Sequence, residues 1–323
     1  MLRTITLLGV LAITAGLQCN NAYAQKYPFK AIRLIVPVTA GGGVDTVARL
    51  ISARLNDTMK VPVVVENRVG ADGSIGAAFV AKAPPDGYTV LIASSSHVAH
   101  ANLRNDLSYN LLKDFAPVSL ITSSPQLLVA HSSVPVKSVS ELIALAKSKP
   151  GALSFASSGN GGAPHLAGEL FKSMAGIDIR HISYKGGGPA MVDVLGGRVE
   201  LYFSSVTGAM PQVKAGKLKA LAITSSNRNS LIPDIPTLSE SGLPGYFASN
   251  WYSFLVPAGT PSLVIEKLNH ETVSALKVPE LAGKLISEGF EIIASTPAEL
   301  GAFMSEEMAK TATLIKAANI RLD

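Results

Sequence analysis

Three short glycine-rich segments, residues 39–43, 159–162 and 185–188, have the composition of an anion-binding site. Each segment follows an apolar run typical of a buried strand and precedes a stretch with helical spacing of its apolar residues. Glycine lets backbone N–H groups approach a ligand closely, and a helix N-terminus presents unpaired N–H groups with a partial positive charge. Several such segments around one cleft would hold an anion through the backbone alone. The pattern therefore predicts ligand capture rather than catalysis.

The glycine segments do not match the phosphate-binding motifs of nucleotide sites. The sequence contains no Gly-Lys-Ser/Thr, which excludes a Walker A loop. The sixth position of a G-x-G-x-x-G motif is Thr46, Pro164 or Met191 instead of glycine. A G-x-S-x-G nucleophile elbow is also absent, because Asp72 stands where a motif around Ser74 needs its first glycine. We therefore expect no cofactor and no catalytic residue.

Few side chains near these segments have the chemistry of a ligand contact. His165 lies one turn into the helix after the second segment, and it either touches the ligand or braces the loop. Asp45 is interpreted as structural, because a carboxylate stabilises a helix N-terminus but repels an anion. Lys185 either pairs with a ligand charge or is solvated. His97 and His100 are interpreted as structural, since no acidic cluster accompanies them, and we expect no metal site.

Residues 1–24 are typical of an export signal. Arg3 precedes a short apolar run, and Ala22 and Ala24 form an A-x-A cleavage site. The run is shorter than the roughly 20 residues of a membrane span. Cys19 lacks the preceding leucine and small residue that are usual in lipoproteins. We expect cleavage after Ala24 and a periplasmic protein that contains no cysteine and needs no disulfide.

The composition argues against a nucleic-acid partner. The formal net charge is +5, and it becomes +4 when Arg3 leaves with the signal, since 27 basic and 23 acidic residues remain. No Lys/Arg cluster or basic helix occurs. The small positive charge is compatible with attraction of small anions, but its more common meaning is simple solubility. We expect the protein to act as a monomer.

Strand and helix signals alternate along the chain, which predicts an α/β protein built on mainly parallel sheets flanked by helices. Predicted strands at residues 126–130 and 249–256 are interpreted as crossings between two domains. About 300 mature residues suit two domains. The first domain is expected to be discontinuous, comprising residues 25–127 and 250–323, around a second domain of residues 128–249.

Several short motifs, in this order and spacing, resemble the Bug family of TctC-like periplasmic solute-binding receptors, which serve tripartite tricarboxylate transporters. The first two are PVTAGGGVD at residues 37–45 and ENRVGADGSIG at residues 66–76. The resemblance covers nearly the whole mature chain. The other segments that carry it are 85–89, 114–118, 161–171, 184–187, 195–199, 236–242 and 257–261.

The resemblance implies a two-lobed Venus-flytrap fold of the periplasmic binding proteins. Such a protein closes on a small organic carboxylate and delivers it to membrane permease subunits. In this family loop backbone groups, hydroxyls and ordered waters hold one carboxylate. Carried onto this sequence, ligand contacts are expected from Thr39, Ala40, Gly41, Gly42, Gly43, Ser94, Ser95, Ser96, Ser158, Gly159, Asn160, Gly161, Gly162, His165, Tyr184, Lys185, Gly186, Gly187, Ser204 and Ser205.

Two alternatives to a transport receptor stay open at this point. An extracytoplasmic sensor subunit that reports to a membrane kinase would have the same fold and site. A secreted hydrolase using His165 and a nearby serine is the alternative from the enzyme class. The chain also departs from many relatives at residues 204–207 and at Ser253, which follows Trp251 and Tyr252. The resemblance therefore does not decide among a dicarboxylate, a tricarboxylate, an amino acid, an aromatic acid and an uncharged amide.

Overall fold

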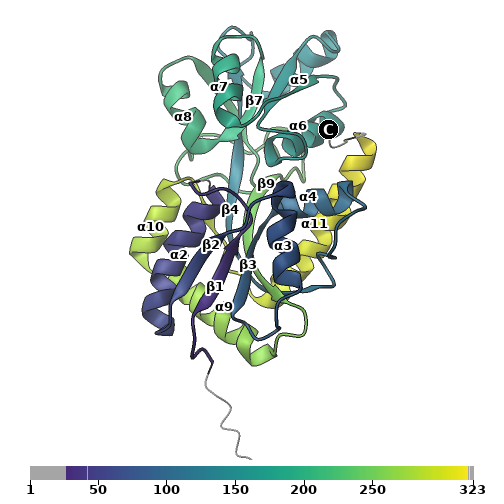
Figure 1. Ribbon diagram of the computed structural model, residues 1–323. Coiled ribbons are helices and arrows are strands. Elements are labelled where there is room, and N and C mark those ends of the chain that lie inside the picture. The colour runs from purple at the N-terminus through teal and green to yellow at the C-terminus, as the bar shows by residue number, and fades with distance from the viewer. Residues whose placement is uncertain (1–26, 42, 319, 321–323) are drawn as a thin grey trace, which may run out of the picture.

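The structure is a computed structural model that describes residues 27–41, 43–318 and 320. The predicted signal at residues 1–24 and the predicted site residue Gly42 lie outside the described residues. The chain forms two α/β lobes joined by long strands (Figure 1). Within the described part of the chain, no helix combines the length and apolar character needed to span a membrane.

The first lobe is a helix-flanked sheet at the lower end of Figure 1. Its strands run in the order β2 (Val63–Asn67), β1 (Ile32–Val36), β3 (Thr89–Ser94), β9 (Ser249–Pro257) and β4 (Phe115–His131), with β10 (Glu291–Ile292) on β4. The helices α2 (Gly43–Met59), α9 (Ser262–Leu276) and α10 (Pro279–Ser287) share one apolar core. A second core contains α3 (Ser74–Ala81), α4 (Ser95–Leu103) and α11 (Pro297–Ala317). A short 3-10 turn, η2 (Ala71–Gly73), precedes α3.

The second lobe is also a sheet flanked by helices. Its sheet contains the last part of β4 with β7 (Leu201–Ser205), β5 (Ser154–Ser157), β6 (Arg180–Ser183) and β8 (Leu218–Ile223). The helices α5 (Val139–Ser148) and α6 (Ala163–Ala175) pack in one core. The helices α7 (Gly187–Leu195) and α8 (Val206–Lys214) pack in another. The predicted α/β class is therefore confirmed.

The sheets are mixed, which differs from the expected mainly parallel arrangement. The antiparallel pairs are those made by β4 and β9. β4 leads the chain from the first lobe to the second and β9 leads it back, so the two strands run in opposite directions. The predicted lobe boundaries at 127/128 and 249/250 fall inside β4 and at the start of β9, and they stay a prediction.

β4 is much longer than the predicted strand at residues 126–130. It pairs with β9 as far as Pro125 and with β7 from Gln126 onward. Residues 123–125, Ser-Ser-Pro, have the composition of a loop, and β-bulges interrupt the pairing after Pro117 and Leu120. Pairing with β9 at all three residues, and with β10 at Ser123, holds the segment extended, because β-structure depends strongly on its neighbours.

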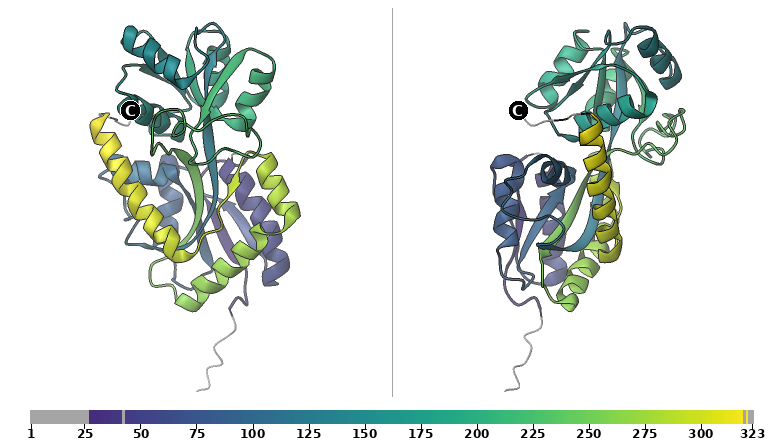
Figure 2. Two further views of the ribbon diagram at one scale, coloured as in Figure 1. Left: turned by 180° about the vertical axis from the view of Figure 1, so that it is seen from behind. Right: turned by 90° about the vertical axis from the view of Figure 1, so that its right-hand side faces the viewer.

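A helix and a side-chain hydrogen bond also connect the lobes. α11 runs along one side of the first lobe and reaches α6 of the second lobe (Figure 2). The side chain of Asn229, from a loop of the second lobe, donates a hydrogen bond to Glu291 of β10 at 3.0 Å. The helices α2, α4, α6, α7 and α8 begin directly after strands or short loops at the ends of the sheets that face the other lobe.

Candidate functional site

A cavity of about 500 Å³ lies between the two lobes. Among the described residues that line it, none is Lys, Arg or His, and Glu288 is the one carboxylate, exposed beyond the end of α10. The rest of the wall consists of glycines and other small residues, uncharged polar side chains and aromatic rings. The lining residues are Gly41, Gly43, Thr46, Ser96, Ser124, Gln126, Ser158, Gly162, Ala163, Pro164, Gly187, Tyr202, Ser205, Thr207, Asn250, Tyr252, Glu288 and Phe290.

Five helices present their first turns to this cavity, and they come from both lobes. α2 contributes Gly43, α4 contributes Ser96, α6 contributes Ala163, α7 contributes Gly187 and α8 contributes Thr207. Each helix N-terminus carries unpaired N–H groups and a partial positive charge. The arrangement can therefore bind an anion without a basic side chain.

The first glycine segment is held in place by a buried carboxylate. Asp45 is 3% exposed, and its Oδ2 accepts hydrogen bonds from the backbone N–H of Gly41 at 3.0 Å and from Arg49 Nε at 2.8 Å. Its Oδ1 accepts from Asn67 Nδ2 at 2.9 Å. The Arg49 hydrogen bond is the main reason that the pKa of Asp45 falls to about 2. Asp45 therefore has the structural role that the sequence predicts, since its carboxylate joins the loop to α2 and to the end of β2.

The second glycine segment is braced by His165. The backbone N–H of Gly161 donates to His165 Nδ1 at 3.0 Å, and the ring stacks on His181 with centroids 3.8 Å apart. Burial, together with the nearby His181 and Lys172, lowers the pKa of His165 to about 3, so the ring is neutral at neutral pH. His165 is not among the residues that line the cavity. The geometry therefore favours the bracing role over ligand contact.

The serines after β3 have three different environments. Ser94 caps α4 together with His97, whose pKa burial lowers to about 4. Ser95 Oγ donates to Asn250 Oδ1 at 2.7 Å, and Ser96 lines the cavity. The three serines therefore serve helix capping, a contact between α4 and β9, and the cavity wall.

The predicted ligand-binding residues divide into two groups. Those on the cavity wall are Gly41, Gly43, Ser96, Ser158, Gly162, Gly187 and Ser205. Those described but not on the wall are Thr39, Ala40, Ser94, Ser95, Gly159, Asn160, Gly161, His165, Tyr184, Lys185, Gly186 and Ser204. Two of this second group show why. The hydroxyl of Tyr184 donates to Asp193 Oδ2 at 2.8 Å, and Lys185 is exposed to solvent.

Sequence reasoning missed most of the aromatic and amide wall. Asn250 and Tyr252 lie beside one departure from the family pattern and Thr207 lies within another, and these departures point to the far end of the pocket. All three residues line the cavity, although the sequence does not single them out as ligand contacts. Gln126 and Ser124 come from the crossing strand β4, and Tyr202 comes from β7. No local sequence signal marks Ser124, Gln126 and Tyr202, since they reach the cavity only through strand pairing.

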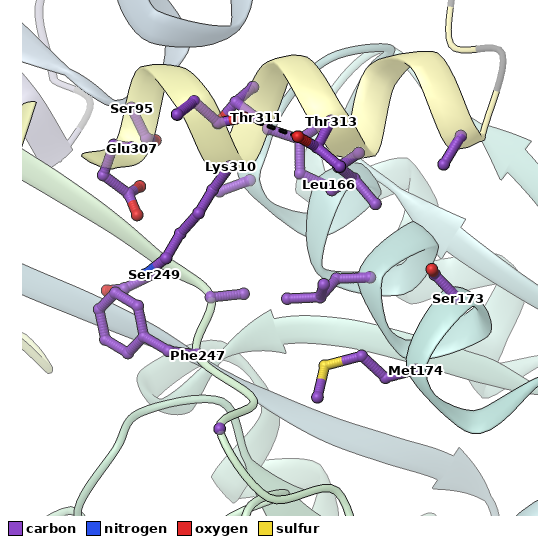
Figure 3. Close-up of a pocket in the computed structure, with 17 residues that line it drawn as sticks. Ser95, Leu166, Ser173, Met174, Phe247, Ser249, Glu307, Lys310, Thr311 and Thr313 are labelled. Atoms are coloured by element: carbon purple, nitrogen blue, oxygen red, sulfur yellow. Dashed lines mark hydrogen bonds between the residues drawn. The ribbon is translucent and has the colours of Figure 1, made fainter. Parts of the chain in front are cut away.

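A second cavity of about 500 Å³ lies between α6 and α11 (Figure 3). Its walls carry apolar side chains such as Leu166, Met174 and Leu314, with Glu307 and Lys310 on α11. Glu307 accepts a hydrogen bond from Trp251 Nε1 at 3.2 Å, and burial raises its pKa. No described residue of the three glycine segments lines this cavity. Ala163, which directly follows the second segment, does line it. The polar cavity is therefore the candidate site for a small anion.

Two α/β lobes joined by crossing strands, with a polar cavity between them, define the class of two-lobed solute-binding proteins. Structure comparison agrees with this class. The adipate-bound protein of R. palustris is 35% identical, with a TM-score of 0.77, and the match covers 92% of this chain and 100% of that one. MatC from Rhodopseudomonas palustris with bound malate is 32% identical, with a TM-score of 0.73, over 90% of this chain and 100% of that one.

Sequence comparison gives the family. The profile of the tripartite tricarboxylate transporter family receptor, TctC, matches residues 47–320. Protein BugT of Bordetella pertussis (strain Tohama I) is 35% identical over 324 residues, which is 100% of this chain and 99% of BugT. The chain therefore belongs to the TctC family of transporter receptors, which confirms the predicted family, fold and solute-binding class.

Proposed function

We propose that this protein captures a small organic carboxylate in the cavity between its lobes. The observation that carries the proposal is the convergence of five helix N-termini on a polar cavity with no basic side chain among its described lining residues. Partial positive charges and unpaired N–H groups suit an acceptor-rich anion such as a carboxylate. The adipate and malate bound to the two related structures support the same ligand class.

The captured ligand is delivered, in this proposal, to the membrane permease subunits of a tripartite tricarboxylate transporter. Membership of a transporter receptor family supports this partner. The chain acts in the periplasm as a monomer after cleavage between Ala24 and Gln25. N-terminal sequencing of protein recovered from the periplasm checks the cleavage, and a lipid-modified Cys19 at the N-terminus would contradict it.

The site geometry supports binding without turnover. Ser157 Oγ lies 2.6 Å from His181 Nε2, but Ser157 is fully buried and cannot meet a substrate. His165 Nδ1 accepts from the Gly161 N–H, so this nitrogen is not available as a base. A secreted hydrolase is therefore not favoured.

A ligand screen tests the carboxylate proposal. Thermal-shift measurements with a panel of organic acids and their amides come first, followed by calorimetry and by mass spectrometry of acids released from the purified protein. A ligand at 100 times its Kd stabilises the native state by about 2.7 kcal/mol, which such a screen detects. If no acid stabilises the protein, or if the amides bind as tightly as the acids, the proposal is wrong.

A further inference from the structure

The Tyr202 side chain is buried, and its hydroxyl is the polar group that it brings to the cavity wall. Tyr202 is 4% exposed, and it lines the cavity from β7. Within the described part of the chain its hydroxyl has no hydrogen-bond partner. Burial raises the pKa of the phenol, so it remains protonated and can donate. Because the hydroxyl opens on the cavity, a ligand bound there can supply the acceptor for its proton.

The start of α7 lies directly against this hydroxyl. A Cβ atom on Gly187, the first residue of α7, would lie 3.1 Å from Tyr202 Oη. Gly186, the residue before α7, has no side chain and therefore does not cap the first N–H groups of the helix. The hydroxyl and the helix start therefore present hydrogen-bond donors to the same point of the cavity.

The first lobe contains a similar pair of donors, a tyrosine hydroxyl and a helix start. A Cβ atom on Gly43, the first residue of α2, would lie 2.8 Å from Tyr252 Oη. Ser95 donates to Asn250 Oδ1, and Asn250 Nδ2 donates to Tyr252 Oη at 3.1 Å. Because Tyr252 accepts this bond, its own proton is available to a further acceptor. Each lobe thus places one tyrosine hydroxyl at one glycine-initiated helix.

We propose that Tyr202 determines specificity by donating a hydrogen bond to a second acidic group of the ligand, at the start of α7. The first acidic group then lies at the start of α2, beside Tyr252. This inference rests on the proposed function and adds a residue and a requirement to it: a molecule with acidic groups at both ends. One cavity of about 500 Å³ contains Gly43, Tyr252, Gly187 and Tyr202, so a single ligand can meet both donor pairs. The exposed Glu288 is the one described carboxylate on the wall, and water and salt screen it.

Deletion of one hydroxyl tests this role. The variant Tyr202→Phe is compared with the wild-type protein by calorimetry against glutarate and adipate, and against valerate and hexanoate as one-ended acids of equal length. Loss of a hydrogen bond to a charged group lowers affinity by roughly tenfold to a hundredfold. We expect Tyr202→Phe to weaken binding of the diacids by this factor and to change binding of the monoacids by less than about threefold.

The matched control is Tyr109→Phe. Tyr109 is a buried tyrosine of the first lobe that packs edge-on against Phe115 and does not line the cavity. The Tyr109→Phe variant should bind every probe as the wild-type protein does. If the wild-type protein and Tyr202→Phe bind the diacids equally well, the inference is wrong and the proposed function still stands. Equal losses for diacids and monoacids would also overturn it, since Tyr202 would then only shape the cavity. Wild-type protein that binds the monoacids as tightly as the diacids would overturn the inference as well, whereas the screen of organic acids and amides decides the proposed function.

Discussion

Gly43→Ala should block the first-lobe end of the cavity while leaving the protein folded. The new Cβ would lie 2.8 Å from Tyr252 Oη, which is closer than real Cβ contacts. Tyr252 is 4% exposed, packs against Phe290 and accepts a hydrogen bond from Asn250, so it has little room to move away. Gly43 does not have a positive φ, so the substitution tests space rather than backbone strain.

The expected loss of affinity follows from the contact that is displaced. If the Tyr252 hydroxyl and the first N–H groups of α2 hold a carboxylate, shifting them removes at least one charge-assisted hydrogen bond. Such a bond is worth about 1.5–3 kcal/mol, or roughly tenfold to a hundredfold in Kd. Overpacking costs about 1–3 kcal/mol of stability, and alanine in a helix returns about 0.5–1 kcal/mol, so the variant should stay folded.

Calorimetry with the carboxylate that the screen identifies measures the loss, and circular dichroism with urea unfolding checks the fold. Gly283→Ala is the matched control, because Gly283 lies in α10 and its added Cβ would meet no atom within 4 Å. It should bind normally and gain about 0.5–1 kcal/mol of stability. Lys185→Ala, which removes an exposed charge, should cost less than about tenfold, or ~1.4 kcal/mol. A larger loss for Lys185→Ala than for Gly43→Ala would refute binding by backbone and hydroxyl groups.

Three further outcomes are expected. The pKa of His165 is about 3 in the folded protein and about 6.5 in the unfolded chain, so its contribution to stability is lost as pH falls from about 6.5 to 3. His165→Gln should therefore make the free energy of unfolding less dependent on pH in acid, by at most about 1.4 kcal/mol per pH unit. Urea unfolding at pH 4.5 and 7 measures this dependence, and a variant with the same dependence as the wild-type protein would contradict the prediction. Gly168→Ala should destabilise the second lobe by at least about 1–3 kcal/mol, because its Cβ would lie 2.1 Å from Phe155 Cε2; a normal Tm would show that the core yields. Ligand should decrease the radius of gyration in small-angle scattering, since both lobes line the cavity, and an unchanged radius at saturation would mean that ligand does not drive closure.

The sequence by itself determined the elements that carry the glycine segments. The apolar run before residues 39–43 is β1, and the helix after it is α2; the second and third segments likewise join β5 to α6 and β6 to α7. These assignments succeed because strand pattern, glycine and helix start are local properties of the chain. The structural role of Asp45 follows from the same local reasoning, since its carboxylate lies at the first turn of α2.

Only the tertiary structure decided which side chains share the cavity. Tyr202 and Tyr252 lie in different lobes and 50 positions apart in the sequence, and each reaches its glycine through sheet packing. β4 extends across both lobes because β9 and β7 pair with it, although its own residues include prolines. The sequence leaves His165 open between ligand contact and loop brace, and only the fold shows its ring engaged by Gly161 and His181. The physical reason is the same in each case: strand register and side-chain packing are long-range interactions, and a local pattern does not contain their partners.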